Sequence, residues 1–202
     1  QYTRQQTFTM GPSNWPCYTK VKIGAKKDGT IVGNDYYLCE EIGACLNNSF
    51  FSGRLSSSGA LPVYGWGGNL RMDTYAVATN AVPAAEYRGL GCPEAEFGIE
   101  ILMNELAEKL NMSPVELRMK NILNDGENNC QGDLITSIGV KKCLQAVADE
   151  IKIDEPSVQD MGVWKKGKGL AIGGKQNTPL GRSEAVVKYN SDGTITVIFN
   201  YC

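Results

Sequence analysis

Apolar side chains recur at helical spacing in the middle of the chain, where two sets of residues each share a face of one predicted helix. The sets are Phe97 with Ile101, and Leu102 with Leu106 and Leu110. This spacing predicts an amphipathic helix that starts near Pro93 and ends near Leu110. Pro93 suits the first turn of a helix, and the acidic residues beside it suit its positive end.

Two more helices are predicted further along the chain. Ser113, Pro114 and Glu116 match a capping box, in which Ser113 caps the helix and Glu116 reaches back to the cap N–H. That helix should end near Asn121. A third helix is predicted from the apolar spacing of Val140, Cys143, Leu144, Val147 and Ile151.

Strand patterns occur on both sides of these helices. Residues 21–25 and 30–39 flank the turn at Asp28-Gly29, and residues 185–189 and 194–199 flank the turn at Asp192-Gly193. Both pairs predict β-hairpins. We also expect strands over residues 71–81 and 167–174, whereas residues 1–20 show no clear period and should run extended.

Together these elements predict an α+β fold, made of two mixed α/β units in which β-hairpins pack against helices. The polar, glycine-containing stretch from Asn124 to Gly132 is the best candidate for a boundary. We therefore expect one domain over residues 1–128 and the start of a second over residues 129–202. The two similar hairpins suit two related units, but convergence on the same turn chemistry explains them equally well.

Composition narrows the function classes. The chain has 202 residues, of which 42% are apolar and 21% charged, as in ordinary globular proteins. A net charge of −2 gives no basic footprint for nucleic acid or an anionic membrane. No apolar run is long enough to span a bilayer.

Histidine is absent, which excludes a Ser-His-Asp triad and histidine-ligated zinc. The seven cysteines are scattered without a C-x-x-C pair, so neither a zinc site nor an iron–sulfur cluster is indicated. We expect reduced, mostly buried thiols in a cytoplasmic protein. Cys92 lies where thiol pKa values fall, yet a packing role is the expected one. The three tryptophans, Trp15, Trp66 and Trp164, are expected to fill the core.

The candidate site is the stretch Glu86-Tyr87-Arg88-Gly89-Leu90-Gly91-Cys92-Pro93-Glu94, directly before the first predicted helix. Two glycines let the backbone turn tightly and approach a bulky group. Free N–H groups that lead into a helix start can hold oxygen-rich or anionic ligands. On its own the pattern is weak, because most such loops are plain turns.

A longer stretch, from Pro83 to Asn121, resembles the molybdopterin-binding subunit of the xanthine dehydrogenase, aldehyde oxidoreductase and carbon monoxide dehydrogenase family. Members typically read P-x-x-x-[FY]-R-G-x-G-x-P-[QE], then E-x-x-[MI]-[DN]-x-[LVI]-A-x-x-L-G-[ML]-[DS]-P-x-E-[LF]-R-x-x-N. The resemblance is tight in the middle of the chain and looser at both ends. It implies an internal piece of that subunit, inactive by itself.

The resemblance implies a molybdenum hydroxylase that oxidises an aldehyde or an N-heterocyclic, purine-type substrate at carbon, with water as the oxygen source. The implied cofactor is molybdenum–molybdopterin, in the cytosine dinucleotide form if the protein is bacterial. Electrons would leave through iron–sulfur clusters and FAD on partner subunits or domains. The glutamate base of the family is expected outside this chain, so no catalytic residue and no direct metal ligand is assigned here.

The same resemblance implies two groups of site residues. Those expected at the cofactor are Tyr87, Arg88, Gly89 and Gly91, and those expected in the substrate pocket are Leu90, Lys175, Gln176 and Asn177. Leu90 is aliphatic where members often carry an aromatic side chain, which weakens stacking on a flat substrate. A plain polar turn at residues 175–177 is the competing interpretation, and a non-catalytic scaffold of the same fold is the competing function.

Overall fold

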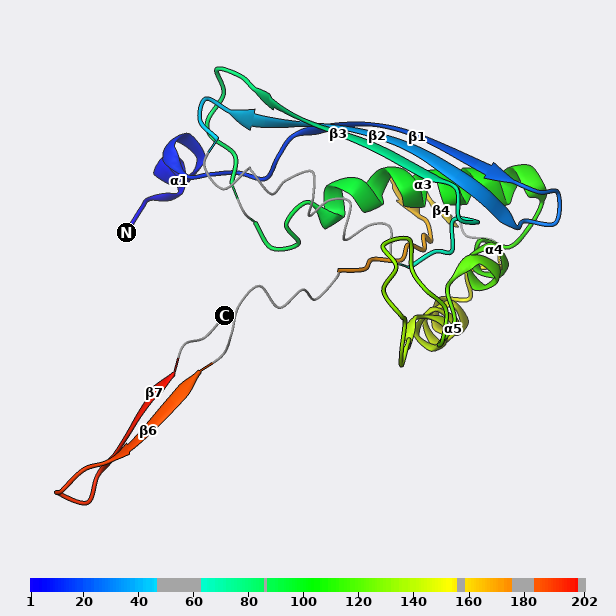
Figure 1. Cartoon of the computed structure of the whole chain (residues 1–202). Coiled ribbons are helices and arrows are strands. Elements are labelled where there is room, and N and C mark those ends of the chain that lie inside the picture. The colour runs from blue at the N-terminus through cyan, green and yellow to red at the C-terminus, as the bar shows by residue number, and fades with distance from the viewer. Residues whose placement is uncertain (47–62, 86, 156–158, 176–183, 200–202) are drawn as a thin grey trace.

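The computed structural model describes residues 1–46, 63–85, 87–155, 159–175 and 184–199. Its elements, labelled in Figure 1, are α1 (Arg4–Met10), β1 (Cys17–Ala25), β2 (Ile31–Gly43), β3 (Leu70–Ala78), α3 (Cys92–Leu110), α4 (Pro114–Asn121), α5 (Val140–Ile151), β4 (Gln159–Met161), β5 (Trp164–Lys166), β6 (Ala185–Tyr189) and β7 (Ile195–Phe199). This is the α+β fold that the sequence predicts. None of the helices in the described ranges has the length and apolar character needed to span a bilayer.

A three-stranded sheet, in the order β1-β2-β3, forms one layer, and α3 lies along one of its faces (Figure 1). β1 and β2 are antiparallel, as the hairpin prediction requires, and β3 runs parallel to β2. At the turn, the Thr30 N–H donates to Asp28 Oδ1 at 3.0 Å, and Gly29 takes φ of +83°. From Asn34 to Ile42, every second residue of β2, including Tyr36 and Leu38, is buried.

The helix α3 packs through residues four apart: Ala95, Ile99, Met103 and Ala107 are all at most 2% exposed. The face predicted from Phe97 and Ile101 is wrong, since these side chains are 69% and 45% exposed. Small residues bring the helix close to the sheet. At Gly98, for example, a Cβ atom would lie 2.9 Å from Thr19 Oγ1 of β1.

The helices α4 and α5 have the predicted positions. Ser113 is the N-cap of α4, with Pro114 at the first helical position. Its Oγ accepts a hydrogen bond from the Val115 N–H at 3.1 Å. The predicted return bond from Glu116 to the cap N–H is not found among the described residues, so the full capping box is wrong and only the Ser113 half forms. In α5, Leu144 and Ala148 are buried in the same core as Ile99 of α3, although they lie beyond residue 128. The domain division at residue 128 stays a prediction.

Several local expectations are wrong. Residues 4–10 form α1 instead of running extended, because Thr3 and Gln6 make a reciprocal capping box. Residues 167–175 form no strand. Trp15 and Trp66 are buried, but Trp164 is 77% exposed on the short β4-β5 hairpin.

The cysteines also differ from expectation. The six in the described residues are free thiols, yet only Cys92 is buried. The second predicted hairpin is confirmed as β6-β7, which extends away from the rest of the molecule in Figure 1.

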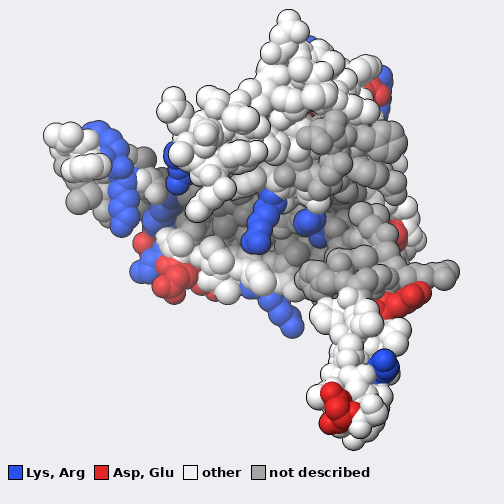
Figure 2. Space-filling model, turned by 90° about the vertical axis from the view of Figure 1, so that its left-hand side faces the viewer, with Lys and Arg blue, Asp and Glu red and all other residues white. Residues whose placement is uncertain are grey.

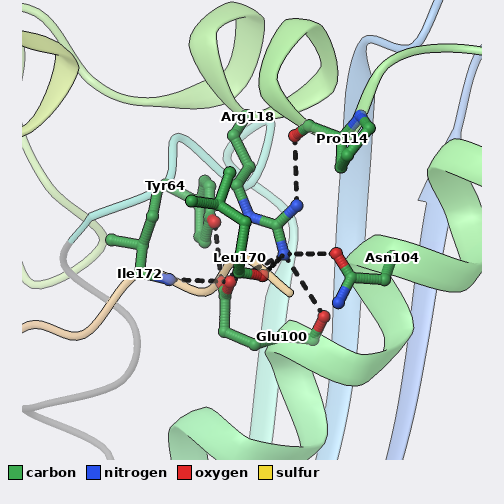
Figure 3. Close-up of polar contacts among 7 residues, drawn as sticks. All are labelled: Tyr64, Glu100, Asn104, Pro114, Arg118, Leu170 and Ile172. Carbon is green, nitrogen blue, oxygen red and sulfur yellow. Dashed lines mark hydrogen bonds and ion pairs between the residues drawn. The ribbon is translucent and has the colours of Figure 1, made fainter. Parts of the chain in front are cut away.

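A buried ion pair joins α3 to α4. Arg118 Nη2 lies 2.8 Å from Glu100 Oε2, and the two side chains are 0% and 6% exposed. The Tyr64 hydroxyl donates to Glu100 Oε1 at 2.7 Å, and Arg118 Nη2 also donates to Asn104 Oδ1 at 2.9 Å. Figure 3 shows these groups converging between the two helices.

The same pair holds the irregular segment that follows β5. The Leu170 carbonyl accepts from Arg118 Nη2 at 3.3 Å, and the Ile172 N–H donates to Glu100 Oε2 at 2.9 Å (Figure 3). A segment without a β-sheet partner thus has its backbone groups paired by side chains of the two helices.

Arg118→Met tests this network. Methionine keeps much of the side-chain length but leaves the Glu100 carboxylate buried without its cation. Because breaking one side of a buried ion pair costs about 3–5 kcal/mol, the free energy of unfolding of the intact protein should fall by that amount in chemical denaturation. In a Glu100→Gln background the same substitution should cost much less. Equal losses in both backgrounds would show that the charge pair is not what Arg118 contributes.

Candidate functional site

The turn before α3 has an unusual backbone. Gly89, Leu90 and Gly91 all have positive φ, at +104°, +50° and +86°. The turn is closed by the Leu90 N–H donating to the Tyr87 carbonyl at 2.8 Å and by the Cys92 N–H donating to the Gly89 carbonyl at 3.1 Å. Glycine adopts the angles of +104° and +86° without strain, and a Cβ at Gly89 would lie 2.7 Å from two ring carbons of Pro93. The glycines are therefore required by this turn.

The outer side of the turn offers unused hydrogen-bond donors. Among the described residues, the N–H groups of Arg88, Gly89 and Gly91 make no hydrogen bond, and the Arg88 side chain has no ion-pair partner. Tyr87 is 64% exposed, Arg88 is exposed and Leu90 is half-buried. Such donors beside a cation at a helix start suit oxygen atoms or an anion.

Positive charge does not form a continuous patch on the face of the molecule shown in Figure 2. On the face shown in Figure 2, lysine and arginine side chains are scattered among uncharged residues, and acidic ones lie between them. The net charge of the chain is −2. A chain with this net charge offers no long-range positive field toward an anionic ligand.

Cys92 begins α3 and is 4% exposed. Burial, followed by the negative charge of Glu96, raises the pKa of its thiol to about 11, and the nearby Lys175 opposes this rise. A thiol with so high a pKa is a poor nucleophile at neutral pH. Cys92 is thus a packing residue, as the sequence indicates.

Lys175 lies near the same end of α3, although it is far from that helix in the sequence. The Gly174 N–H beside it donates to Glu96 Oε1 at 2.5 Å, and the Lys175 charge acts on Cys92. The structure therefore brings Lys175 to the helix start that follows the Tyr87–Gly91 turn. Gln176 and Asn177, the other two residues predicted for this wall, lie outside the described residues.

Two glutamates of α3 were not predicted as part of the site. Partial burial raises the pKa of Glu96 to about 7, with Glu100 and Glu94 adding to the rise and the Gly174 N–H opposing it. Both carboxylate oxygens of Glu94 are buried and make no hydrogen bond among the described residues. The sequence offers one signal for these two residues. They are acidic, and they lie near the start of an amphipathic helix, on a side that faces the interior.

The Glu94 charge acts on a residue of the sheet. Burial, then the charges of Glu94 and Glu40, raises the pKa of the Cys17 thiol on β1. The described residues nevertheless contain no group of three or more cysteine and acidic side chains that could hold a metal ion.

Comparisons with known proteins agree on one family. The sequence profile of the molybdopterin cofactor-binding domain matches residues 1–122. The chain is 34% identical over 203 residues to aldehyde oxidoreductase from Megalodesulfovibrio gigas, which covers 97% of this chain and 22% of that protein. It is 26% identical over 189 residues to the xanthine dehydrogenase molybdenum-binding subunit of Escherichia coli O157:H7, covering 87% of this chain and 24% of that subunit.

The fold agrees as well. The crystal structure of aldehyde oxidoreductase from Desulfovibrio desulfuricans superposes with a TM-score of 0.78 at 26% identity, over 98% of this chain and 22% of that one. The chain thus spans about a fifth of the length of these relatives. With the profile matched over more than half of its residues, the chain belongs to the molybdopterin cofactor-binding domain family of the aldehyde oxidoreductase and xanthine dehydrogenase group.

Proposed function

We propose that this chain supplies one side of the molybdenum-cofactor site in an enzyme that oxidises a small substrate at carbon with water as the oxygen source. The observation that carries the proposal is the Tyr87–Gly91 turn, where unused N–H donors and the unpaired Arg88 guanidinium stand together at the start of α3. Membership of the molybdopterin-binding family supports it.

The donor set fits such a group. A pterin dithiolene with bound molybdenum presents sulfur and oxygen acceptors, and the turn presents donors without a competing acidic side chain of its own. Because Gly89 and Gly91 are glycines, the backbone carries no side chain on either side of Leu90. The bound group would supply the two-electron chemistry at the substrate carbon.

Different residues of this chain would then hold the cofactor and orient the substrate. Arg88 and the N–H groups of Gly89 and Gly91 would hold the oxygen and sulfur acceptors, with Tyr87 at the edge. Leu90, half-buried and held at φ of +50°, would face the substrate. Lys175, with Gln176 and Asn177 after it, would form the opposite wall. No residue of this chain is assigned as the base that moves the proton.

We infer the remaining parts of the enzyme from the family. The substrate is an aldehyde or an N-heterocyclic, purine-type compound, and the electrons leave through iron–sulfur clusters and FAD carried by partner subunits or domains. The pterin is the cytosine dinucleotide form if the protein is bacterial, and the enzyme works in the cytoplasm. The remainder of the molybdopterin subunit completes the site and provides the glutamate base.

The substrate wall allows a finer proposal. Leu90 offers no aromatic face for stacking, whereas Lys175 is an exposed ammonium near the same helix start. A pocket with one aliphatic side and one cation suits a small polar substrate that carries a carboxylate. A charge-assisted contact of that kind is stronger than a neutral hydrogen bond.

Gly89→Val in the intact protein tests the cofactor assignment. A valine side chain would meet Pro93 and cover the donors of the turn, so molybdenum content or turnover should fall while the fold survives. Gly126→Val is the matched control, because Gly126 also has positive φ, at +87°, but nothing lies within 4 Å of its added Cβ. Metal analysis, circular dichroism and steady-state rates give the readouts. Normal molybdenum content with normal kcat in Gly89→Val would remove the turn from the site.

Lys175→Met tests the substrate wall. Loss of a charge-assisted contact should raise KM for a carboxylate-bearing aldehyde about tenfold and leave the neutral amide analogue nearly unchanged. Lys109→Met provides the control, since Lys109 is an exposed lysine in the last turn of α3. The measurement is steady-state kinetics on the matched pair of substrates. Equal losses on both would favour the plain polar turn at residues 175–177.

A further inference from the structure

We propose that Glu96 is a positioning residue, whose carboxylate fixes the backbone at Gly174 and thereby sets where Lys175 stands opposite the Tyr87–Gly91 turn. The inference rests on the proposed function, because it assigns a role to Lys175 at that site. It adds a residue that lies outside the glycine-rich motif and whose only signal in the sequence is its place among the acidic residues near the start of an amphipathic helix.

The geometry is a pairing of helix carboxylates with an extended backbone. Glu96 and Glu100 are one helical turn apart on α3, so both side chains lie on the same side of the helix. Glu96 Oε1 accepts the Gly174 N–H at 2.5 Å, and Glu100 Oε2 accepts the Ile172 N–H at 2.9 Å. In an extended chain, N–H groups two residues apart point the same way. The spacing of the two carboxylates along α3 thus agrees with the spacing of alternate N–H groups along the segment.

The burial of the segment follows the same alternation. Leu170 is buried, and Ile172 and Gly174 are half-buried, whereas Ala171, Gly173 and Lys175 are exposed. One side of the segment therefore rests on α3 and the other faces solvent. A Cβ atom at Gly173 would lie 3.3 Å from Glu96 Oε2, which shows how closely the carboxylate runs along this backbone.

The carboxylates of Glu96 and Glu100 have different roles. Glu100 also binds Arg118 and the Tyr64 hydroxyl, so it belongs to the buried network of the core. Glu96 has the Gly174 N–H as its hydrogen-bond partner in the described part of the chain. It is the last such contact before Lys175, and two adjacent glycines, Gly173 and Gly174, would otherwise leave the backbone free there.

Retaining a carboxylate at this place is costly. Burial raises the pKa of Glu96 to about 7, which means that the surroundings disfavour its charge. An apolar residue would pack there without that cost, but it would leave the Gly174 N–H without an acceptor. The role of the side chain at position 96 is thus to provide a hydrogen-bond acceptor for the Gly174 N–H.

The test compares Glu96→Ala, Glu96→Gln and the control Glu105→Ala in the intact protein. Glutamine keeps an acceptor oxygen. Glu105 is an exposed glutamate of the same helix that makes no hydrogen bond or ion pair with the residues that the structure describes. Hydrogen–deuterium exchange of the peptide over residues 170–175 is the first readout, because it needs neither cofactor nor activity. Steady-state kinetics on the carboxylate substrate and its neutral analogue is the second, with molybdenum content measured alongside.

We expect Glu96→Ala to speed exchange at Gly174 and to raise KM for the carboxylate substrate about fivefold, as for one lost hydrogen bond, with kcat and molybdenum content unchanged. Glu96→Gln should restore both properties, and Glu105→Ala should change neither.

Unchanged exchange in Glu96→Ala would overturn the inference whatever the kinetics. Faster exchange with unchanged KM would also overturn it, because the hydrogen bond from Gly174 to Glu96 would then not position Lys175. A wild-type protein without molybdenum or turnover would instead refute the proposed function, and the exchange data would show separately whether Glu96 holds the segment.

Discussion

The buried pair between Arg118 and Glu100 is the interaction on which the rest of the arrangement depends. Two fully buried charges are tolerated only when each is paired and hydrogen-bonded, and here every additional contact also ties down another element. Through Tyr64 the pair reaches the chain before β3, through Asn104 it binds α3 to α4, and through Leu170 and Ile172 it fixes the segment after β5. Burial, followed by the Glu100 charge, raises the pKa of the Tyr64 hydroxyl, which donates its proton to Glu100 Oε1.

The helix α3 transmits this anchoring to the candidate site. Its N-terminal end follows the Tyr87–Gly91 turn, its middle carries Glu96 and Glu100, and its inner face of small and apolar residues fills the core beneath the sheet. A rotation of the helix would move the donors of the turn and the backbone near Lys175 together. The core and the site are therefore linked by one rigid element, as precise placement of a bound group requires.

Elements with a strong local signal could be predicted from the sequence. The helices α3, α4 and α5 follow from apolar spacing and from Ser113-Pro114, and the hairpins follow from their Asp-Gly turns. The helix α1 was missed although Thr3 and Gln6 form a capping box, because residues 1–20 lack a helical period. The strand predicted over residues 167–174 failed for a different reason. The alternating backbone N–H groups of that segment donate to Glu96 and Glu100 and not to a neighbouring strand. These glutamates lie 72 or more residues earlier, and a single sequence does not reveal such a pairing. The same long-range contacts explain why Glu96 was not predicted, whereas the glycine-rich turn was.

The central claim is that this chain provides part of a molybdenum-cofactor site. Molybdenum and pterin analysis of the intact protein tests it most directly, with the protein purified from cells in which a reference molybdenum enzyme is fully loaded. The account predicts molybdenum and pterin in matching amounts, close to the amount of protein. Protein that is folded and free of both, from cells that load the reference enzyme, would contradict the account and favour a scaffold of the same fold.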